Sequence, residues 1–136
     1  MAVTPPYSNL VLNETQEDTF LAGATITQYQ RVQLTSTGTV LPATNAADLS
    51  FGVAKQPIAN GSYGVIRLDM PQSYGLANTL INVGDTVYQA ANGLVSAVLV
   101  NNAILGVAKI GAPVPNANTS NNQAAIIYLG VRKSAI

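Results

Sequence analysis

The residues that could carry acid–base, nucleophilic or metal chemistry are few in this chain of 136 residues, and their types exclude most enzymatic mechanisms. The sequence has no histidine and no cysteine, which removes the usual general base near neutral pH, the usual thiol nucleophile and the common zinc ligands. Carboxylates remain, but Asp48, Asp69 and Asp85 are isolated from one another along the chain. We therefore predict that the protein is not an enzyme and needs no cofactor.

One group of carboxylates, Glu14, Glu17 and Asp18, falls within a short segment near the start of the sequence. Carboxylate oxygens suit a hard cation such as Ca²⁺, which takes about six to eight oxygen ligands. Three acidic residues supply too few ligands unless other groups converge on them, so a solvated acidic segment is the favoured interpretation. The sequence predicts no metal site.

Tyrosine makes up most of the aromatic content, since the sequence has six tyrosines, two phenylalanines and no tryptophan. Tyrosine rings could form a platform for sugar rings, because each has an apolar face and a hydroxyl that can hydrogen-bond. These tyrosines are spread along the chain at strand-like spacing, which favours packing within a barrel or burial in an interface. They are Tyr7, Tyr29, Tyr63, Tyr74, Tyr88 and Tyr128.

Charge is scarce: 9% of the residues are charged and the formal net charge is zero, whereas about 25% is usual in soluble domains. We therefore expect much of the surface to be covered by copies of the chain or by a partner. The basic residues are scattered, so we expect no nucleic acid partner. The longest apolar run, residues 94–100, is too short to cross a bilayer, and the first residues lack the pattern of a signal peptide, so we expect no membrane partner.

The first 22 residues differ from the rest and are predicted to form an extended arm. Pro5 and Pro6 fix the backbone and disfavour helix at the residues before them. We expect the arm to leave the body of the domain or to pack across a neighbour. Its candidate partner-contacting residues are Pro5, Pro6, Tyr7, Leu10, Leu12 and Phe20.

From residue 24 onward the pattern is typical of β-structure. Val, Ile, Thr and Tyr are abundant, and Gly or Asn interrupt the sequence about every 8–12 residues. The strongest turn signals are Asn60-Gly61 and Asn92-Gly93, because a type I′ hairpin turn needs two residues at positive φ. The nearest candidate for a helix, residues 73–82, fits a loop leading into a strand equally well.

Two five-residue stretches, FGVAK at 51–55 and LGVAK at 105–109, nearly repeat each other 54 positions apart. Residues 65–68 correspond to residues 126–129 if the segment between the second GVAK copy and residue 124 carries an insertion. Chance could produce one short match between common residues, so the neighbouring segments decide whether the chain is duplicated.

The neighbouring segments do match, and in the same order. Residues 31–33 correspond to 86–88, and residues 38–40 correspond to 93–95, with a separation of 55 positions in both cases. Matches in one order at an almost constant separation predict a duplicated unit of about four strands.

A unit of about four short strands cannot bury an apolar face alone, so we expect two units to pack together. Each GVAK then marks an equivalent strand, with Val53 or Val107 pointing inward and the lysine solvated at a strand edge. The predicted fold is all-β: a small barrel or sandwich of about 8–10 short strands with an internal pseudo-two-fold duplication. The predicted boundaries are 1–22 for the arm and 23–136 for a single β domain, with halves at about 24–76 and 77–136.

Several segments resemble a family of small capsid cement, or head decoration, proteins of tailed bacteriophages. GDTVYQAANGLVSA (84–97) is followed by ILGVAKIGA (104–112) and a closing strand AAIIYLGV (124–131). The family signature is similar: G-D-x-V-Y, a short turn with Gly, a G-V-A strand and a final strand. Residues 25–58 are similar to the opening unit of the family, and the resemblance covers about residues 24–131.

This resemblance implies a structural virion protein that decorates and stabilises a phage capsid by bridging neighbouring major capsid proteins on the outer surface. It implies a homotrimer whose partner is the major capsid protein and which is made in the cytoplasm of the host bacterium. The alternative is a carbohydrate-binding β module of a phage or bacterial surface structure. A cluster of tyrosines on one exposed face would favour that alternative.

Overall fold

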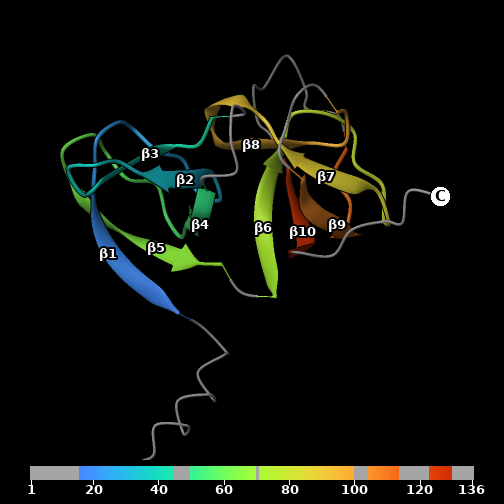
Figure 1. Cartoon of the computed structure of the whole chain (residues 1–136), viewed down its shortest axis with the longest axis horizontal. Coiled ribbons are helices and arrows are strands. Elements are labelled where there is room, and N and C mark those ends of the chain that lie inside the picture. Colours follow the sequence, from blue (N-terminus) through green and yellow to red (C-terminus); the bar gives the residue numbers. More distant parts are fainter. Residues whose placement is uncertain (1–15, 45–49, 70, 100–103, 114–122, 130–136) are drawn as a thin grey trace, which may run out of the picture.

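The described part of the chain forms two closed β-barrels that stand side by side (Figure 1). This computed structural model describes residues 16–44, 50–69, 71–99, 104–113 and 123–129. These residues contain ten strands and one short 3₁₀ turn, η2 at Ala91–Gly93. None of their helices has the length and hydropathy needed to cross a membrane. The predicted all-β class is confirmed.

Five strands close the first barrel. They are β1 Glu17–Ala22, β2 Arg31–Leu34, β3 Thr39–Pro42, β4 Ser50–Ala54 and β5 Tyr63–Leu68. Their order around the barrel is β1-β3-β2-β4-β5, and β5 pairs back with β1. β1 and β3 are parallel, whereas the other pairs are antiparallel.

The second barrel repeats this topology. Its strands are β6 Gln72–Ala77, β7 Thr86–Gln89, β8 Leu94–Ser96, β9 Ile104–Ile110 and β10 Ala124–Leu129. Their order is β6-β8-β7-β9-β10, with β10 paired back to β6. β6 and β8 form the parallel pair, in the same place as β1 and β3.

The duplication extends to the register of the strands. Val32 pairs with Gly52 in the first barrel, and Val87 pairs with Gly106 in the second. In both barrels the register shifts immediately after that valine, as at a β-bulge. The predicted internal duplication is therefore confirmed strand by strand.

Each barrel has its own apolar core, because one face of every strand points into the barrel. The core of the first barrel is built from Ala22, Ile26, Val32, Val40, Ala54, Ile58 and Ile66. The core of the second barrel is built from Ala77, Ile81, Val87, Val95, Leu105, Ala108, Ala112, Ala125 and Ile127. The expectation that the halves need each other to bury an apolar face is wrong, because a fifth strand in each half closes its barrel.

The missed strands are the first strand of each barrel. The predicted arm was extended to residue 22, but Glu17–Ala22 is β1 and pairs with β3 and β5. The strand is difficult to predict from the sequence because its first three residues are exposed and polar. The second unit begins with β6 at Gln72, so the boundary predicted near residue 76 falls inside a strand rather than between the halves.

Two local predictions also change. Val53 is buried whereas Val107 is only half-buried, and the GVAK residues that join the two core clusters are Ala54 and Ala108. Asn92 and Gly93 both have positive φ, 58° and 69°, as predicted for that turn. At the other Asn-Gly pair, positive φ is found only at the glycine, so that turn is not type I′.

The glycines of the two GVAK copies lie where backbones approach closely. A Cβ added to Gly52 would lie 2.5 Å from the carbonyl oxygen of Arg67. A Cβ added to Gly106 would overlap the carbonyl oxygen of Tyr128. The repeat is visible in the sequence because both barrels need a residue without a side chain at this position.

We expect Gly106→Ala to lower the free energy of unfolding by about 2 kcal/mol or more, because the added methyl group would push β9 and β10 apart. Gly38→Asn is the matched control: no atom lies within 4 Å of its added Cβ, and Asn tolerates the φ of 86° at this position. This control should cost less than about 1 kcal/mol. Urea denaturation measures both changes, and equal losses would contradict the close approach.

Candidate functional site at the junction of the two barrels

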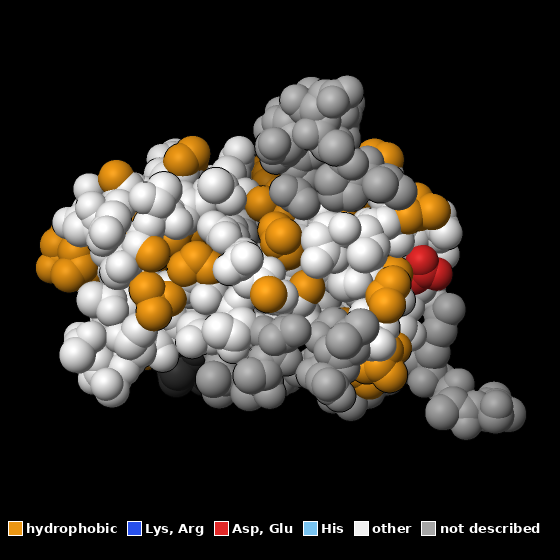
Figure 2. Space-filling view, turned by 90° about the horizontal axis from the view of Figure 1, so that it is seen from above, with side chains coloured by type: hydrophobic (Ala, Val, Ile, Leu, Met, Phe, Trp, Pro, Cys, Tyr) orange, Lys and Arg blue, Asp and Glu red, His pale blue; other side chains and the backbone are white. Residues whose placement is uncertain are grey.

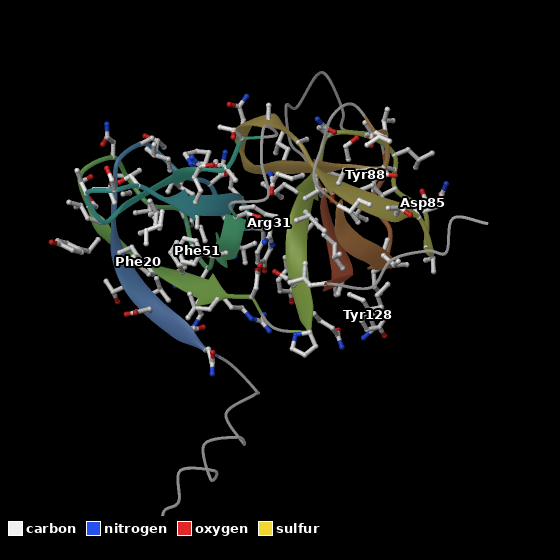
Figure 3. The ribbon with its side chains drawn as sticks, viewed as in Figure 1. Phe20, Arg31, Phe51, Asp85, Tyr88 and Tyr128 are labelled. Carbon is white, nitrogen blue, oxygen red and sulfur yellow. The ribbon has the colours of Figure 1, made fainter. Side chains whose placement is uncertain are left out.

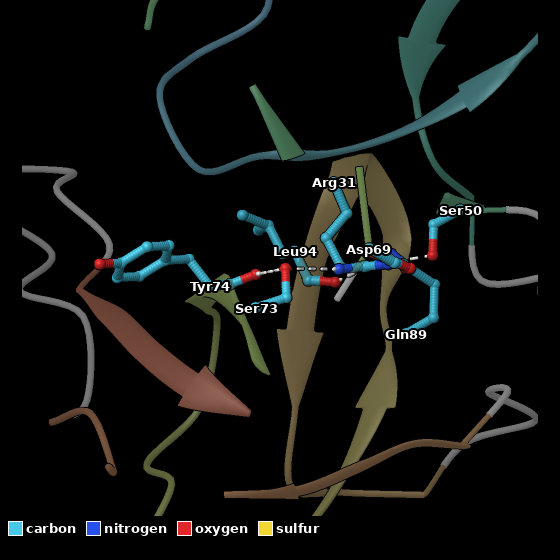
Figure 4. Close-up of polar contacts among 7 residues, drawn as sticks. All are labelled: Arg31, Ser50, Asp69, Ser73, Tyr74, Gln89 and Leu94. Atoms are coloured by element: carbon cyan, nitrogen blue, oxygen red, sulfur yellow. Dashed lines mark hydrogen bonds and ion pairs between the residues drawn. The ribbon is translucent and has the colours of Figure 1, made fainter. Parts of the chain in front are cut away.

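A buried arginine joins the two barrels. Arg31 is the first residue of β2, and its side chain is fully buried. Its guanidinium donates to Asp69 Oδ2 at 2.7 Å and to Ser50 Oγ at 3.0 Å. It also donates to Ser73 Oγ of the second barrel at 3.4 Å (Figure 4). One cation therefore connects the first barrel, the segment between the barrels and β6.

The charge of Arg31 can stay buried because it is paired and hydrogen-bonded. An unpaired buried charge costs several kcal/mol, whereas a pair with further hydrogen bonds offsets much of that cost. Asp69 keeps 31% of its side chain exposed, so the carboxylate remains partly hydrated while the guanidinium does not. The labelled view shows Arg31 at the boundary between the barrels (Figure 3).

The β7–β8 hairpin of the second barrel docks on the first barrel. Gly93 N donates to the carbonyl oxygen of Ala43 at 2.7 Å, and Gln30 Nε2 donates to the carbonyl oxygen of Asn92 at 2.5 Å. Gln89, which is fully buried, donates from Nε2 to two backbone carbonyls of the same hairpin. Backbone and side-chain hydrogen bonds thus add to the ion pair across the junction.

Two tyrosines stack across the same junction. The rings of Tyr29, before β2, and Tyr74, in β6, have centroids 4.4 Å apart and an interplanar angle of 21°. Tyr29 has a φ of 67°, in the left-handed region that bulky residues rarely adopt. The equivalent position of the second barrel, 55 residues later, is Gly84 with a φ of 88°. Strain of this kind is typical of sites that need a particular side chain.

A groove of about 480 Å³ lies beside this tyrosine pair, and we call it the junction groove. Tyr29 and Tyr74 form its aromatic part. The remaining lining comes from the first barrel and is mostly charged or amide-bearing: Glu17, Gln28, Val53, Lys55, Gln56 and Arg67. The arrangement offers aromatic rings, hydrogen-bonding groups and charges of both signs, which suits the binding of a ligand.

The lysine of each GVAK copy bonds to the first strand of its own barrel. Lys55 Nζ lies 3.0 Å from Glu17 Oε2, and Lys109 Nζ donates to Gln72 Oε1 at 3.1 Å. Glu17 begins β1 and Gln72 begins β6, so these contacts are equivalent. Both lysines are exposed, as predicted, but closed barrels leave no strand edge for them to protect.

The predicted partner-contacting residues fall into two groups. Phe20 lies in β1, half-buried, with its ring edge-to-face on Phe51 at 5.4 Å and against the first core (Figure 3). A contact between Phe20 and a partner stays a prediction, limited to the part of the ring that the core leaves exposed. The other five lie outside the described residues: Pro5, Pro6, Tyr7, Leu10 and Leu12.

The two described residues of the acidic segment, Glu17 and Asp18, are not part of an acidic cluster. Glu17 pairs with Lys55, and Asp18 Oδ1 accepts from the backbone N–H of Thr19 at 2.8 Å. Glu14 lies outside the described residues. Within the described ranges, no three acidic side chains come together in a way that could hold a metal ion.

The described tyrosines do not share one exposed platform. Tyr63, 72% exposed, lies in β5 of the first barrel, and Tyr128, 38% exposed, lies in β10 of the second. Tyr29 and Tyr74 are half-buried and face each other. The one aromatic pair beside a groove is therefore at the junction, among the residues that the structure describes.

Exposed apolar side chains gather at one end of the second barrel. A bridge between Ile81 and Ala112 joins the loop after β6 to the end of β9. Ala97 N donates to Thr79 Oγ1 at 3.0 Å, which brings the segment after β8 to the same end. We call this surface the apolar end; its exposed residues are Leu80, Val83, Val98, Leu99 and Ile110.

The first barrel is polar where the second has its apolar end. At the positions equivalent to Leu80, Val83 and Ile110 it has exposed polar residues: Thr25, Gln28 and Gln56. Figure 2 shows apolar side chains dispersed over the face seen from above, one acidic side chain and no Lys or Arg. The duplicated halves therefore share a fold but present different surfaces.

The sequence alone did not identify Arg31 and Tyr29 as residues that join the two barrels. Arg31 carries a signal, because its duplicate position is Thr86 and an arginine inside a short apolar strand needs a partner. Its partner Asp69, 38 residues later, could not be chosen from the sequence. Tyr29 also carries a signal, since it aligns with Gly84, but only the backbone angles reveal the strain.

Comparisons with known proteins show a likeness to a solved structure. No protein-family model matches the chain, and no curated protein matches it. Among solved structures, the chain is similar to the "head fiber gp8.5 N base in bacteriophage phi29", with a TM-score of 0.70 and 15% sequence identity. The alignment covers 90% of this chain and 99% of that chain. At this identity the likeness shows a shared fold.

We expect Asp69→Ala to lower the free energy of unfolding by about 3 kcal/mol, because it leaves the buried charge of Arg31 unpaired. The matched control is Glu17→Ala, which removes the acid from a pair whose lysine is 50% exposed. That control should cost less than about 1 kcal/mol, since water screens the pair. Denaturant titration of both variants checks the difference, and similar losses would contradict the role assigned to Arg31.

Proposed function

We propose that the chain is a structural protein of a bacteriophage virion, bound to the outer surface of the head. The observation that carries this proposal is the fold, because the chain aligns with the base of a bacteriophage head fibre over nearly the whole of both chains. The resemblance of residues 25–58, 84–97, 104–112 and 124–131 to capsid cement proteins supports the same class of protein. An all-β body with few charged groups fits a binding and structural role.

In finer detail, the proposed protein is a cement protein that bridges neighbouring major capsid proteins. Such a protein is made in the cytoplasm of the host bacterium and acts through many copies, each linking several capsid subunits, so that avidity replaces tight single contacts. The two fused barrels support this role, because they give one chain two separate surfaces on which to contact different neighbours.

A homotrimer is the proposed assembly. Each protomer of a trimer meets two others, and an ordinary interface covers about 800 Å² on each partner. Two such faces would cover roughly a fifth of the 7416 Å² surface of the chain. The apolar end is the surface that supports self-association best, because the equivalent surface of the first barrel is polar.

Incubation of the purified chain with phage heads that lack it tests the proposed attachment. The expected result is co-sedimentation with the heads, saturating at a fixed number of copies per particle, and greater resistance of the loaded heads to heat. Heads that retain none of the chain under conditions in which it is folded would contradict the proposal.

Light scattering tests the trimer, which should have three times the chain mass of 14.1 kDa. We expect Val83→Asp, at the 74% exposed position of the apolar end, to shift the protein toward monomer, because a carboxylate must be desolvated in an apolar interface. Leu34→Asp is the control, since Leu34 is exposed on the first barrel. A monomeric wild-type protein, or equal effects of both substitutions, would contradict this interface.

The predicted arm is tested by deletion of residues 1–15, which leaves β1 intact. We expect this deletion to weaken attachment to heads while the thermal unfolding of the barrels is unchanged. Deletion of residues 1–22 would remove β1 and open the first barrel, so it serves as the unfolded comparison. Unchanged attachment after the shorter deletion would contradict a clamping role for the arm.

A further inference from the structure

One cation of the junction groove has no acidic partner. Lys55 is paired with Glu17, whereas Arg67 makes no ion pair with any residue that the structure describes. The Nε of Arg67 is buried and lacks a hydrogen-bond partner among those residues. Its Cζ lies 5.6 Å from the centroid of the Tyr74 ring. An arginine that lines a groove without an ion-pair partner can present its guanidinium to an anionic ligand group.

The position of this arginine is a point of divergence between the barrels. In the second barrel the equivalent residue is Tyr128, since Arg67 pairs with Val53 as Tyr128 pairs with Val107. The lysine beside it is kept in both copies, so the added charge is particular to the junction groove. The scaffold of the barrel does not require an arginine here.

Tyr29 provides a second, independent observation. The scaffold accepts glycine at this left-handed position, as the second barrel shows, yet the first barrel has a tyrosine there. The ring lines the junction groove together with Tyr74. A strained aromatic residue and an uncompensated arginine meet in one groove, and both differ from their duplicates.

The other residues that line the groove favour an acidic sugar over other anionic ligands. Gln28 and Gln56 add planar amides, and Gln28 Nε2 already donates to the carbonyl of Lys55 at 3.2 Å, which leaves its oxygen to accept from a hydroxyl. The groove volume of about 480 Å³ lies in the usual range for small ligands. Ring faces with amides match the apolar faces and hydroxyl edges of a sugar.

Two other ligand classes fit less well. An extended peptide binds most readily by pairing with a free strand edge, and both sheets are closed. A nucleic acid needs a row of cations along its phosphates, whereas the groove lining has only Lys55 and Arg67, and Lys55 is paired with Glu17. We propose that the junction groove binds an acidic saccharide, with the sugar ring against Tyr29 and its carboxylate on Arg67.

Titration of the full chain with an oligogalacturonide, followed by NMR chemical shifts, tests this proposal. We expect the oligogalacturonide to bind the wild type with chemical-shift changes confined to the junction groove. The methyl-esterified form, which lacks the charge, should bind about tenfold more weakly than the acid, or weaker still. Arg67→Met should lose this preference for the acid. Tyr29→Gly should weaken binding of both forms by about tenfold, and it is expected to fold because glycine accepts the local φ.

Two controls keep the test specific. Lys109→Met and Tyr63→Ala remove an exposed cation and an exposed ring outside the groove, and both should bind like the wild type. The proposal is overturned if the acid and the ester bind equally, if Arg67→Met binds like the wild type, or if no saccharide binds. Tighter binding of a poly-glutamate peptide at the same residues would also overturn it in favour of a protein partner.

Discussion

The arrangement of the two barrels depends on burying one positive charge between them. Arg31 leaves water completely, so it must find hydrogen-bond acceptors that neither barrel supplies in full: one hydroxyl in β4, one in β6 and the carboxylate of Asp69 between the barrels. Because a buried guanidinium without partners is strongly unfavourable, these groups can be satisfied together in few relative positions of the barrels. The tyrosine stack and the docked hairpin add further contacts between the barrels, and the junction groove lies beside the tyrosine stack.

Duplication explains the fold, whereas divergence between the copies explains the surfaces. Closure of each barrel pairs every strand on both sides, so each half can change its outer residues without losing its core. The two copies differ in a consistent way. The first copy has Arg31, Tyr29 and Arg67 at the junction, where the second has Thr86, Gly84 and Tyr128. The second copy instead presents the apolar end. One copy thus carries the polar groove and the other the surface suited to association.

The sequence predicts the duplication but not the closure of each half. The repeat is readable because Gly52 and Gly106 lie against equivalent carbonyls and cannot vary freely. The first strand of each barrel is not predicted from the sequence. β1 begins with three exposed residues, and β6 contains Gly75, a residue type that is common in loops. The partners of Arg31 come from distant segments, and no local pattern selects them. Composition predicts a covered surface, but only the structure shows that most of the exposed large apolar side chains among the described residues lie on the second copy.

The central claim is that two barrels, fixed together at a buried arginine, serve as one structural unit on a phage head. A cryo-electron microscopy reconstruction of heads carrying the chain tests this claim most directly. The account predicts three-fold clusters of density on the outer surface, each copy fitting both barrels in the arrangement of Figure 1 without adjustment. Heads without such density, or density that requires the two barrels to be fitted apart, would contradict it.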